Sequence, residues 1–409
     1  MAVFDKLRGD KGRAKAGVRG VGKLGRYELL HPLGCGGMAE VFKARASGPA
    51  GFERDVVVKR ILPQYTRDPD FVRMFADEAR ILGLMHHPNV VQAYEFGEDG
   101  GTLYLALEYI EGPSLSKVLR TLRAASRPMP PAIVAYVARE ICRALDYVHR
   151  LENGDGERLD VVHRDVTPSN IIVTPSGAVK LLDFGVAKFA TAAKSTRAGT
   201  VKGKPAYLAP EQLQGKPIDG RVDLFALGIV MHEMLTLQHL FAGDSDVHTA
   251  KKIMEMKIPS ITARRQDVPP DLERIVMRAL ERDRKRRFAT AAEMARALDD
   301  FILASQLHVE EVAAFIRDID TLSGPPRLVY VNPERPRSDE AATRRDRGMR
   351  LRMTARRMRT PRFAAVAALV LTMIGLGAAF GLHTSTAAAK GTPASGGAAA
   401  AAHVDSPRR

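Results

Sequence analysis

The chain has 409 residues, of which 45% are apolar and 27% are charged, so it can bury a sizeable core and wholesale disorder is excluded. Its two cysteines, Cys35 and Cys142, exclude a disulfide framework and a multi-cysteine zinc site. The formal net charge of +15 lies in flanking segments, because residues 27–332 carry equal numbers of acidic and basic side chains. We therefore expect no nucleic-acid partner.

The first part of the chain predicts a basic arm followed by strands. Residues 1–26 are basic and rich in glycine, which predicts a flexible arm. From Tyr27 on, short runs of β-branched and aromatic residues predict strands, and one amphipathic stretch predicts a helix. The strands are expected at 27–30, 41–44, 56–59 and 103–109, and the helix at 71–85.

After Gly112 the pattern becomes helical. Apolar and amphipathic stretches predict helices at 133–149, 222–235, 271–280, 291–303 and 309–319. A small strand-rich lobe followed by a larger helical lobe indicates an α+β fold over residues 27–302. A helical extension at 303–332 follows, and then an arginine-rich linker at 333–362.

Residues 363–382 predict a single membrane-spanning helix. They contain no charged side chain, and 20 residues of helix reach about 30 Å, the thickness of a bilayer core. Arginines crowd the preceding linker, so the positive-inside rule places residues 1–362 in the cytoplasm, at the inner membrane of the cell. The low-complexity tail at 383–409 would lie outside. The spacing of Gly377 and Gly381 suits a helix–helix contact and allows a homodimer in the bilayer.

A glycine-rich segment between two predicted strands begins the chemical motifs. Gly34 and Gly36 lie in the run from Leu33 to Val41, where residues without bulk let backbone N–H groups approach a phosphate chain. Lys59 ends a β-branched strand and needs a carboxylate partner if it is buried. Glu78, in the predicted helix that follows, can supply that carboxylate.

Three further motifs follow in order. His163-Arg164-Asp165 precedes Asn170 by a spacing that suits a base beside a metal ligand. Asp183-Phe184-Gly185 comes after a short predicted strand, and Ala209-Pro210-Glu211 comes 28 residues after Asp183. Each motif alone is compatible with turn chemistry, but the ordered set at these spacings indicates a single active site.

The set resembles the protein kinase superfamily, specifically the eukaryotic-like serine/threonine protein kinases of bacteria, over about residues 27–302. The resemblance implies a bilobal kinase fold with ATP between the lobes, Mg²⁺ (or Mn²⁺) as the metal and proteins as substrates. It implies a metal-binding role for Asn170 and Asp183, and a catalytic role for Asp165, Lys59 and Glu78. The residues implied to hold ATP are Leu33, Gly34, Gly36, Val41, Lys59 and the backbone of Glu108 and Ile110.

The resemblance also implies structural pairs. Glu211 is expected to pair with Arg287, and Asp223 to anchor the backbone near His163. His163 and Phe184 are expected to stack toward the core.

Two positions depart from the family pattern. Thr167 stands where serine/threonine kinases usually carry lysine, and Lys204 stands where they usually carry threonine. Because these positions face each other in the family fold, we add Lys204 to the catalytic residues and expect it to reach Asp165 from the opposite wall, with Thr167 as its hydrogen-bond partner. The departures weaken the distinction between serine/threonine and tyrosine acceptors, although neither common tyrosine-kinase variant of this loop is present.

The sequence therefore predicts a membrane-anchored serine/threonine protein kinase that phosphorylates proteins, itself included, in bacterial signalling. The alternative is a membrane-tethered pseudokinase scaffold that binds nucleotide or partners without turnover. The complete set of motif residues favours the enzyme.

Overall fold

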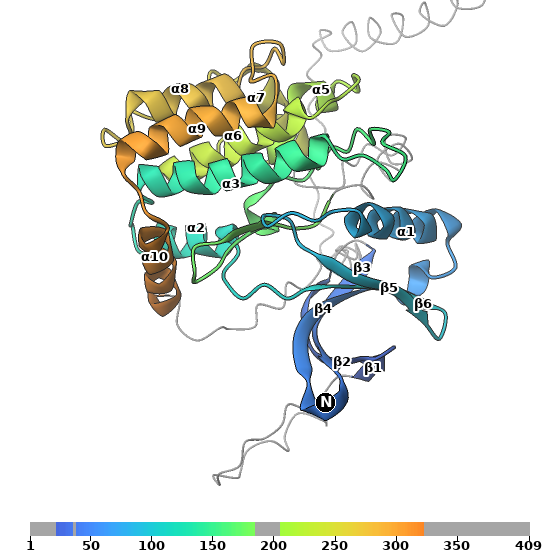
Figure 1. The fold of residues 1–409 in the computed structure, drawn as a ribbon. Helices are drawn as coiled ribbons and strands as arrows, with labels where there is room; N and C mark the ends of the chain where they lie inside the picture. The colour runs from blue at the N-terminus through green and yellow to red at the C-terminus, as the bar shows by residue number, and fades with distance from the viewer. Residues whose placement is uncertain (1–21, 36–37, 185–204, 323–409) are drawn as a thin grey trace, which may run out of the picture. The chain divides into compact units, whose positions relative to one another are not determined.

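The structure is a computed structural model that describes residues 22–35, 38–184 and 205–322. In this part of the chain a strand-rich region is followed by a helical region, as the sequence predicts (Figure 1). Gly36, Lys204 and the predicted membrane helix at 363–382 lie outside the described residues. Within the described residues, no helix combines the length and apolar character that a membrane crossing requires.

The small lobe is a six-stranded antiparallel sheet in the order β1-β2-β3-β4-β6-β5. Successive side chains of each strand point to opposite faces of the sheet, and both faces are apolar. One face is covered by Tyr27, Phe42, Val56 and Val58, and the other carries Ile61, Leu105 and Leu107 into the core shared with α1. The elements are β1 (Gly22–Leu24), β2 (Tyr27–Cys35), β3 (Ala39–Ser47), β4 (Glu53–Ile61), α1 (Pro69–Gly83), β5 (Ala93–Asp99) and β6 (Thr102–Glu108).

Capping residues set where α1 begins. Asp68 precedes Pro69 at the first helical position, and its carboxylate accepts hydrogen bonds from the backbone N–H groups of Asp70 and Phe71. The helix buries Met74, Phe75, Ala79 and Leu82, together with one charged residue, Glu78. A buried carboxylate on an otherwise apolar face requires a partner from the sheet.

The large lobe surrounds α6. This helix is buried along nearly its whole length and packs against α3 and α8. A Cβ atom at Gly228 would meet Ala279 and Leu280 at 3.0–3.1 Å, so glycine permits the close approach to α8. The elements are α2 (Leu115–Ala124), α3 (Pro131–His149), β7 (Ile171–Val173), β8 (Val179–Leu181), α5 (Pro210–Leu213), α6 (Arg221–Thr236), α7 (Asp246–Glu255), α8 (Pro270–Ala279), α9 (Ala291–Ser305) and α10 (Val309–Leu322).

The structure differs from the sequence prediction at the edges. Residues 22–24, assigned to the flexible arm, form β1, because they pair with β2 and bury Leu24. The prediction also missed β5, α2 and α7. The start of α2 did carry a signal, since the Ser114 hydroxyl accepts a hydrogen bond from the backbone N–H of Lys117.

Candidate active site

Lys59 joins the two lobes. The odd-numbered residues of β4 face α1, where Glu78 is buried and only 2% exposed. This places Lys59 opposite Glu78, which is the partner of the lysine. Its Nζ lies 2.6 Å from Glu78 Oε1 and 3.4 Å from Asp183 Oδ1. Burial opposes the charge of Lys59, but these carboxylates outweigh it and raise the pKa of the amine. The side chain is therefore a fixed cation at neutral pH.

Asp165 is oriented by the end of its own loop. Residues Pro168–Asn170 form a short 3₁₀ turn, which brings the Asn170 side chain back over Asp165. Asn170 Nδ2 donates to Asp165 Oδ2 at 2.7 Å and to the Asp165 carbonyl at 3.0 Å. The carboxylate is thus held in one orientation at the mouth of the loop.

A residue of α6 anchors the loop that carries Asp165. Asp223, which is fully buried, accepts hydrogen bonds from the backbone N–H groups of His163 (2.8 Å) and Arg164 (2.7 Å). His149 Nε2, at the end of α3, donates to the same carboxylate at 2.8 Å. Burial by itself would raise the pKa of Asp223, but the hydrogen bonds from His149 and from the Arg164 backbone help to lower it overall. The negative charge therefore stays, and it fixes the backbone one residue before Asp165.

His163 links this loop to the segment that carries Asp183. Its Nδ1 accepts from the Asp165 N–H (3.2 Å) and its Nε2 donates to the Leu182 carbonyl (3.0 Å). Burial lowers the pKa of His163, so the ring is neutral in this tautomer. The ring also packs on Phe184, with centroids 4.5 Å apart.

A short hairpin brings Asn170 and Asp183 together. Asn170 directly precedes β7, and Asp183 follows β8 by two residues. Ile171 pairs with Leu181, and the Leu182 N–H donates to the Asn170 carbonyl at 2.8 Å. Asp183 has a φ of +46°, a strained value for a residue other than glycine, and such strain is concentrated at functional sites.

The remaining predicted ATP contacts lie on the sheet above Lys59. Gly34 pairs with Val41, and Val41 pairs with Lys59. A Cβ atom at Gly34 would meet no atom within 4 Å, so space remains open there, and Leu33 beside it is exposed. Glu108 ends β6 and Ile110 packs on the core two residues later. The predicted ATP contacts that the structure describes thus lie on the same sheet as Lys59 or just after its strand β6.

The arrangement fits a magnesium nucleotide. The amide nitrogen of Asn170 donates a hydrogen bond to Asp165. The amide oxygen of Asn170 is therefore left for another partner. The Asp183 side chain is 51% exposed, although Lys59 lies beside it. Mg²⁺ commonly takes one or two oxygen ligands from protein and the rest from phosphates and water. In the part of the chain that the structure describes, no group of three His, Cys, Asp or Glu residues could hold a metal ion by itself.

The comparisons with known proteins agree with this geometry. The model of the protein kinase domain family matches residues 27–298. This chain belongs to the protein kinase family.

Its relatives include kinases named for different acceptors. The kinase region is 41% identical over 278 residues to the tyrosine-protein kinase MasK of Myxococcus xanthus. This match covers 68% of this chain and 43% of MasK. It is 38% identical to the serine/threonine-protein kinase PknB of Mycobacterium tuberculosis, covering 66% of this chain and 42% of PknB. For the serine/threonine-protein kinase PrkC of Bacillus subtilis, the identity is 33%, and the match covers 66% of this chain and 39% of PrkC. The chain thus spans about two fifths of the length of these relatives.

Among solved structures, the kinase domain of Mycobacterium tuberculosis PknI is similar, with a TM-score of 0.51 and 26% identity. The match covers 70% of this chain and 99% of that one.

The kinase fold confirms the structural pairs expected from sequence. Both terminal nitrogens of Arg287 donate hydrogen bonds to the Glu211 carboxylate, at 2.7 and 2.9 Å, and both side chains are buried. Asp223 anchors the backbone at His163, and His163 packs on Phe184.

Two kinase residues escaped the sequence analysis. His149 contributes a third donor to Asp223, and only its place at the end of an apolar helix hinted at a role. Lys180 in β8 forms an ion pair with Glu108 at 2.8 Å, which ties the end of β6 to the β7–β8 hairpin. No local pattern connects residues 72 positions apart.

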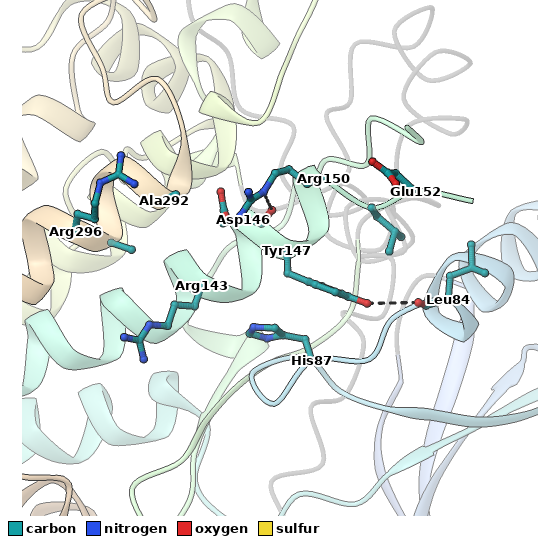
Figure 2. A pocket seen from close by; sticks show the side chains of 11 residues that line it. Leu84, His87, Arg143, Asp146, Tyr147, Arg150, Glu152, Ala292 and Arg296 are labelled. Atoms are coloured by element: carbon teal, nitrogen blue, oxygen red, sulfur yellow. Dashed lines mark hydrogen bonds and ion pairs between the residues drawn. The ribbon is translucent and has the colours of Figure 1, made fainter. Parts of the chain in front are cut away.

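A hollow of about 790 Å³ lies away from these residues, between α3, α9 and the segment after α1 (Figure 2). Tyr147 crosses it and accepts a hydrogen bond from the His86 N–H at 2.9 Å. Two of its arginines are already paired, Arg143 with Glu140 and Arg150 with Asp146. None of the predicted site residues lines this hollow.

Proposed function

We propose that this chain transfers the γ-phosphoryl group of ATP to serine and threonine hydroxyls of proteins, including its own. The observation that carries the proposal is the Lys59–Glu78 pair at 2.6 Å with Asp183 at 3.4 Å, opposite the Asp165–Asn170 pair. A fixed cation, two oxygen ligands and an oriented carboxylate are the groups that phosphoryl transfer requires of a kinase.

The residues divide the work by position. Lys59, held by Glu78, binds the α- and β-phosphates, and the strand around Gly34 and Val41 covers them. Asp165 orients the acceptor hydroxyl and takes its proton. Asn170 and Asp183 would hold Mg²⁺, which would neutralise the charge that develops on the β- and γ-phosphate oxygens. The backbone of Glu108 and Ile110 binds adenine.

A second candidate function is transfer to tyrosine, and two observations favour it. The kinase region is 41% identical to a protein named a tyrosine-protein kinase. In addition, Thr167 replaces the usual lysine; it is 1% exposed, and its Oγ1 has no hydrogen-bond partner in the described part of the chain. Position 167 therefore lacks the positive charge that serine/threonine kinases usually carry there. The serine/threonine assignment rests on PknB and PrkC and on the absence of the common tyrosine-kinase loop variants.

Phosphoamino-acid analysis separates the two acceptors. The purified full chain is incubated with Mg-ATP and a general acceptor protein, with Asp165→Asn as the control for contaminating kinases. We expect phosphoserine and phosphothreonine that depend on Asp165. Phosphotyrosine alone would replace the first assignment by the second. Intact mass without any phosphate adduct would favour the pseudokinase scaffold.

We also propose that residues 363–382 anchor the kinase in the cell inner membrane, with the kinase domain in the cytoplasm. The support is a stretch of 20 uncharged residues behind an arginine-rich linker. The full chain should remain in membranes after carbonate extraction, whereas a variant with three arginines inside the stretch should not. Gly377→Ile with Gly381→Ile should weaken self-association of the anchored chain if a homodimer forms through this helix.

A further inference from the structure

The helix α10 lies outside the residues matched by the kinase family model, which end at 298. It is nevertheless packed on the large lobe beside α2 (Figure 1). Its buried residues follow a helical period and its other side is exposed. The buried residues are Val312, Ala313, Phe315, Ile316 and Ile319.

Residues of α10 from Val309 to Arg317 contact the turn between β7 and β8. Arg317 Nη1 donates to the Pro175 carbonyl at 2.9 Å. Gly177, in the same turn, has a φ of +87°, and a Cβ atom there would lie 3.0 Å from the Val309 carbonyl and 3.5 Å from the Ala313 nitrogen. From the opposite side, the Tyr136 hydroxyl of α3 donates to the Gly177 carbonyl at 3.2 Å. The turn is therefore held between α3 and α10.

A second set of contacts attaches α10 to the end of α2. Arg127 pairs with Asp318, and its guanidinium lies over the Phe315 ring, 5.2 Å from the centroid. The helix α10 is therefore fastened to the segment after α2 as well as to the β7–β8 turn.

The turn that α10 holds belongs to the hairpin with both metal ligands. Only three residue pairs join β7 to β8, and Asn170 and Asp183 stand at its open end, one and two residues from the strands. Flanking backbone also bonds both strands, at Leu181 and at Val173, so the hairpin is a stiff unit and a displacement of its closed end is passed to its open end.

We propose that α10 is a positioning element for the metal-ligand pair: by clamping the β7–β8 turn, it sets the relative placement of Asn170 and Asp183. The proposal rests on the proposed kinase function for its purpose, but the mechanical link can be tested without turnover. It makes α10 a part of the catalytic unit that the family model does not include. Arg317 and Ala313 are its positioning residues.

Two pairs of full-length variants isolate the contact. Ala313→Glu places a charge on the buried face of α10 beside Gly177, whereas Ala314→Glu makes the same change on its exposed neighbour. Arg317→Ala removes the bond to Pro175, whereas Arg317→Lys keeps a donor. The second pair keeps the test informative if Ala313→Glu unfolds the lobe.

Two measurements are made on each variant. The first is the Mg²⁺ concentration that half-saturates binding of a fluorescent ADP analogue. The second is hydrogen exchange of amides 171–182 without nucleotide. We expect Ala313→Glu to raise the Mg²⁺ requirement about tenfold and Arg317→Ala about threefold, the effect of one lost hydrogen bond. Both should speed exchange in the hairpin, while Ala314→Glu and Arg317→Lys stay near wild type.

The outcomes separate the two proposals. If Ala313→Glu frees α10, seen as faster exchange at 309–322, and yet leaves hairpin exchange and the Mg²⁺ requirement unchanged, the positioning role is wrong. Arg317→Ala equal to wild type in both measurements also contradicts it. Failure of the wild-type chain to transfer phosphate would instead remove the proposed function, and hairpin exchange would still report the mechanical link.

Discussion

The interior of the large lobe and the cleft use the same kinds of charged side chain in opposite ways. In the interior, Asp223 is buried and bonded to backbone N–H groups and to His149, and Glu211 and Arg287 are buried and bonded to each other. In the cleft, the Asp183 side chain stays 51% exposed and shares Lys59 with Glu78. Buried charges here hold backbone in place, and accessible charges remain for ligands.

The difference follows from what each environment costs. A buried charge must have bonds to replace the lost water, so it is committed to its partners. A carboxylate that keeps part of its hydration can exchange water for a metal ion. The comparison predicts that changes in the cleft remove activity but not the fold, and that changes in the interior remove both.

The largest expected effect on activity is in the cleft. Asp183→Asn and Lys59→Met should each lower kcat on the order of a thousandfold, because they remove a metal ligand or the phosphate-binding cation. The melting temperature of Asp183→Asn should stay close to wild type, because that side chain is 51% exposed. Lys59→Met also removes the lysine partner of the buried Glu78, so it should lower the melting temperature without unfolding the chain. Phosphotransfer by purified Asp183→Asn protein, free of other kinases, would contradict the assignment, and circular dichroism melting checks the fold.

The interior makes the opposite prediction. Arg287→Met leaves Glu211 buried without its partner and should lower the free energy of unfolding by about 3 to 5 kcal/mol. The double variant Arg287→Met with Glu211→Leu should recover most of that loss, since no unpaired charge remains. Urea unfolding of both variants measures the difference. Equal losses in the single and double variants would show that packing, and not charge burial, dominates here.

A buried histidine sharpens the comparison through pH. Burial, with Arg264 nearby, lowers the pKa of His232 to about 4. The unfolded chain binds this proton near pH 6.5, so the stability linked to His232 is complete above that pH and is lost as the pH falls toward 4. The loss should reach about 3 kcal/mol. His232→Phe should flatten this part of the pH profile of urea unfolding, and an unchanged slope would count against a buried neutral ring.

The smallest expected effect concerns the exchanged residues at the substrate entrance. Lys204 lies outside the described residues, and its reach toward Asp165 stays a prediction. Lys204→Thr alone and Thr167→Lys alone should each lower kcat about tenfold, and the double variant should recover much of the activity. Additive losses in this double-mutant cycle would show that the two positions act independently.

Sequence analysis identified the candidate residues of the active site and the order in which they occur. Lys59, Asp165, Asn170 and Asp183 are recognisable because each stands in a local motif, and phosphoryl transfer constrains those motifs. The apolar helices α3 and α6 were also predictable, because helical periodicity is a local property of the chain.

Only the tertiary structure decided which groups support that chemistry. The contacts of His149 with Asp223, of Lys180 with Glu108 and of Arg317 with Pro175 join residues 74, 72 and 142 positions apart. Periodicity showed that α10 has an apolar face but not that the β7–β8 turn lies against the helix. A pattern states which side is buried, and packing states what covers it. The same limit explains the strand at 22–24, whose few residues become a strand only by pairing with β2.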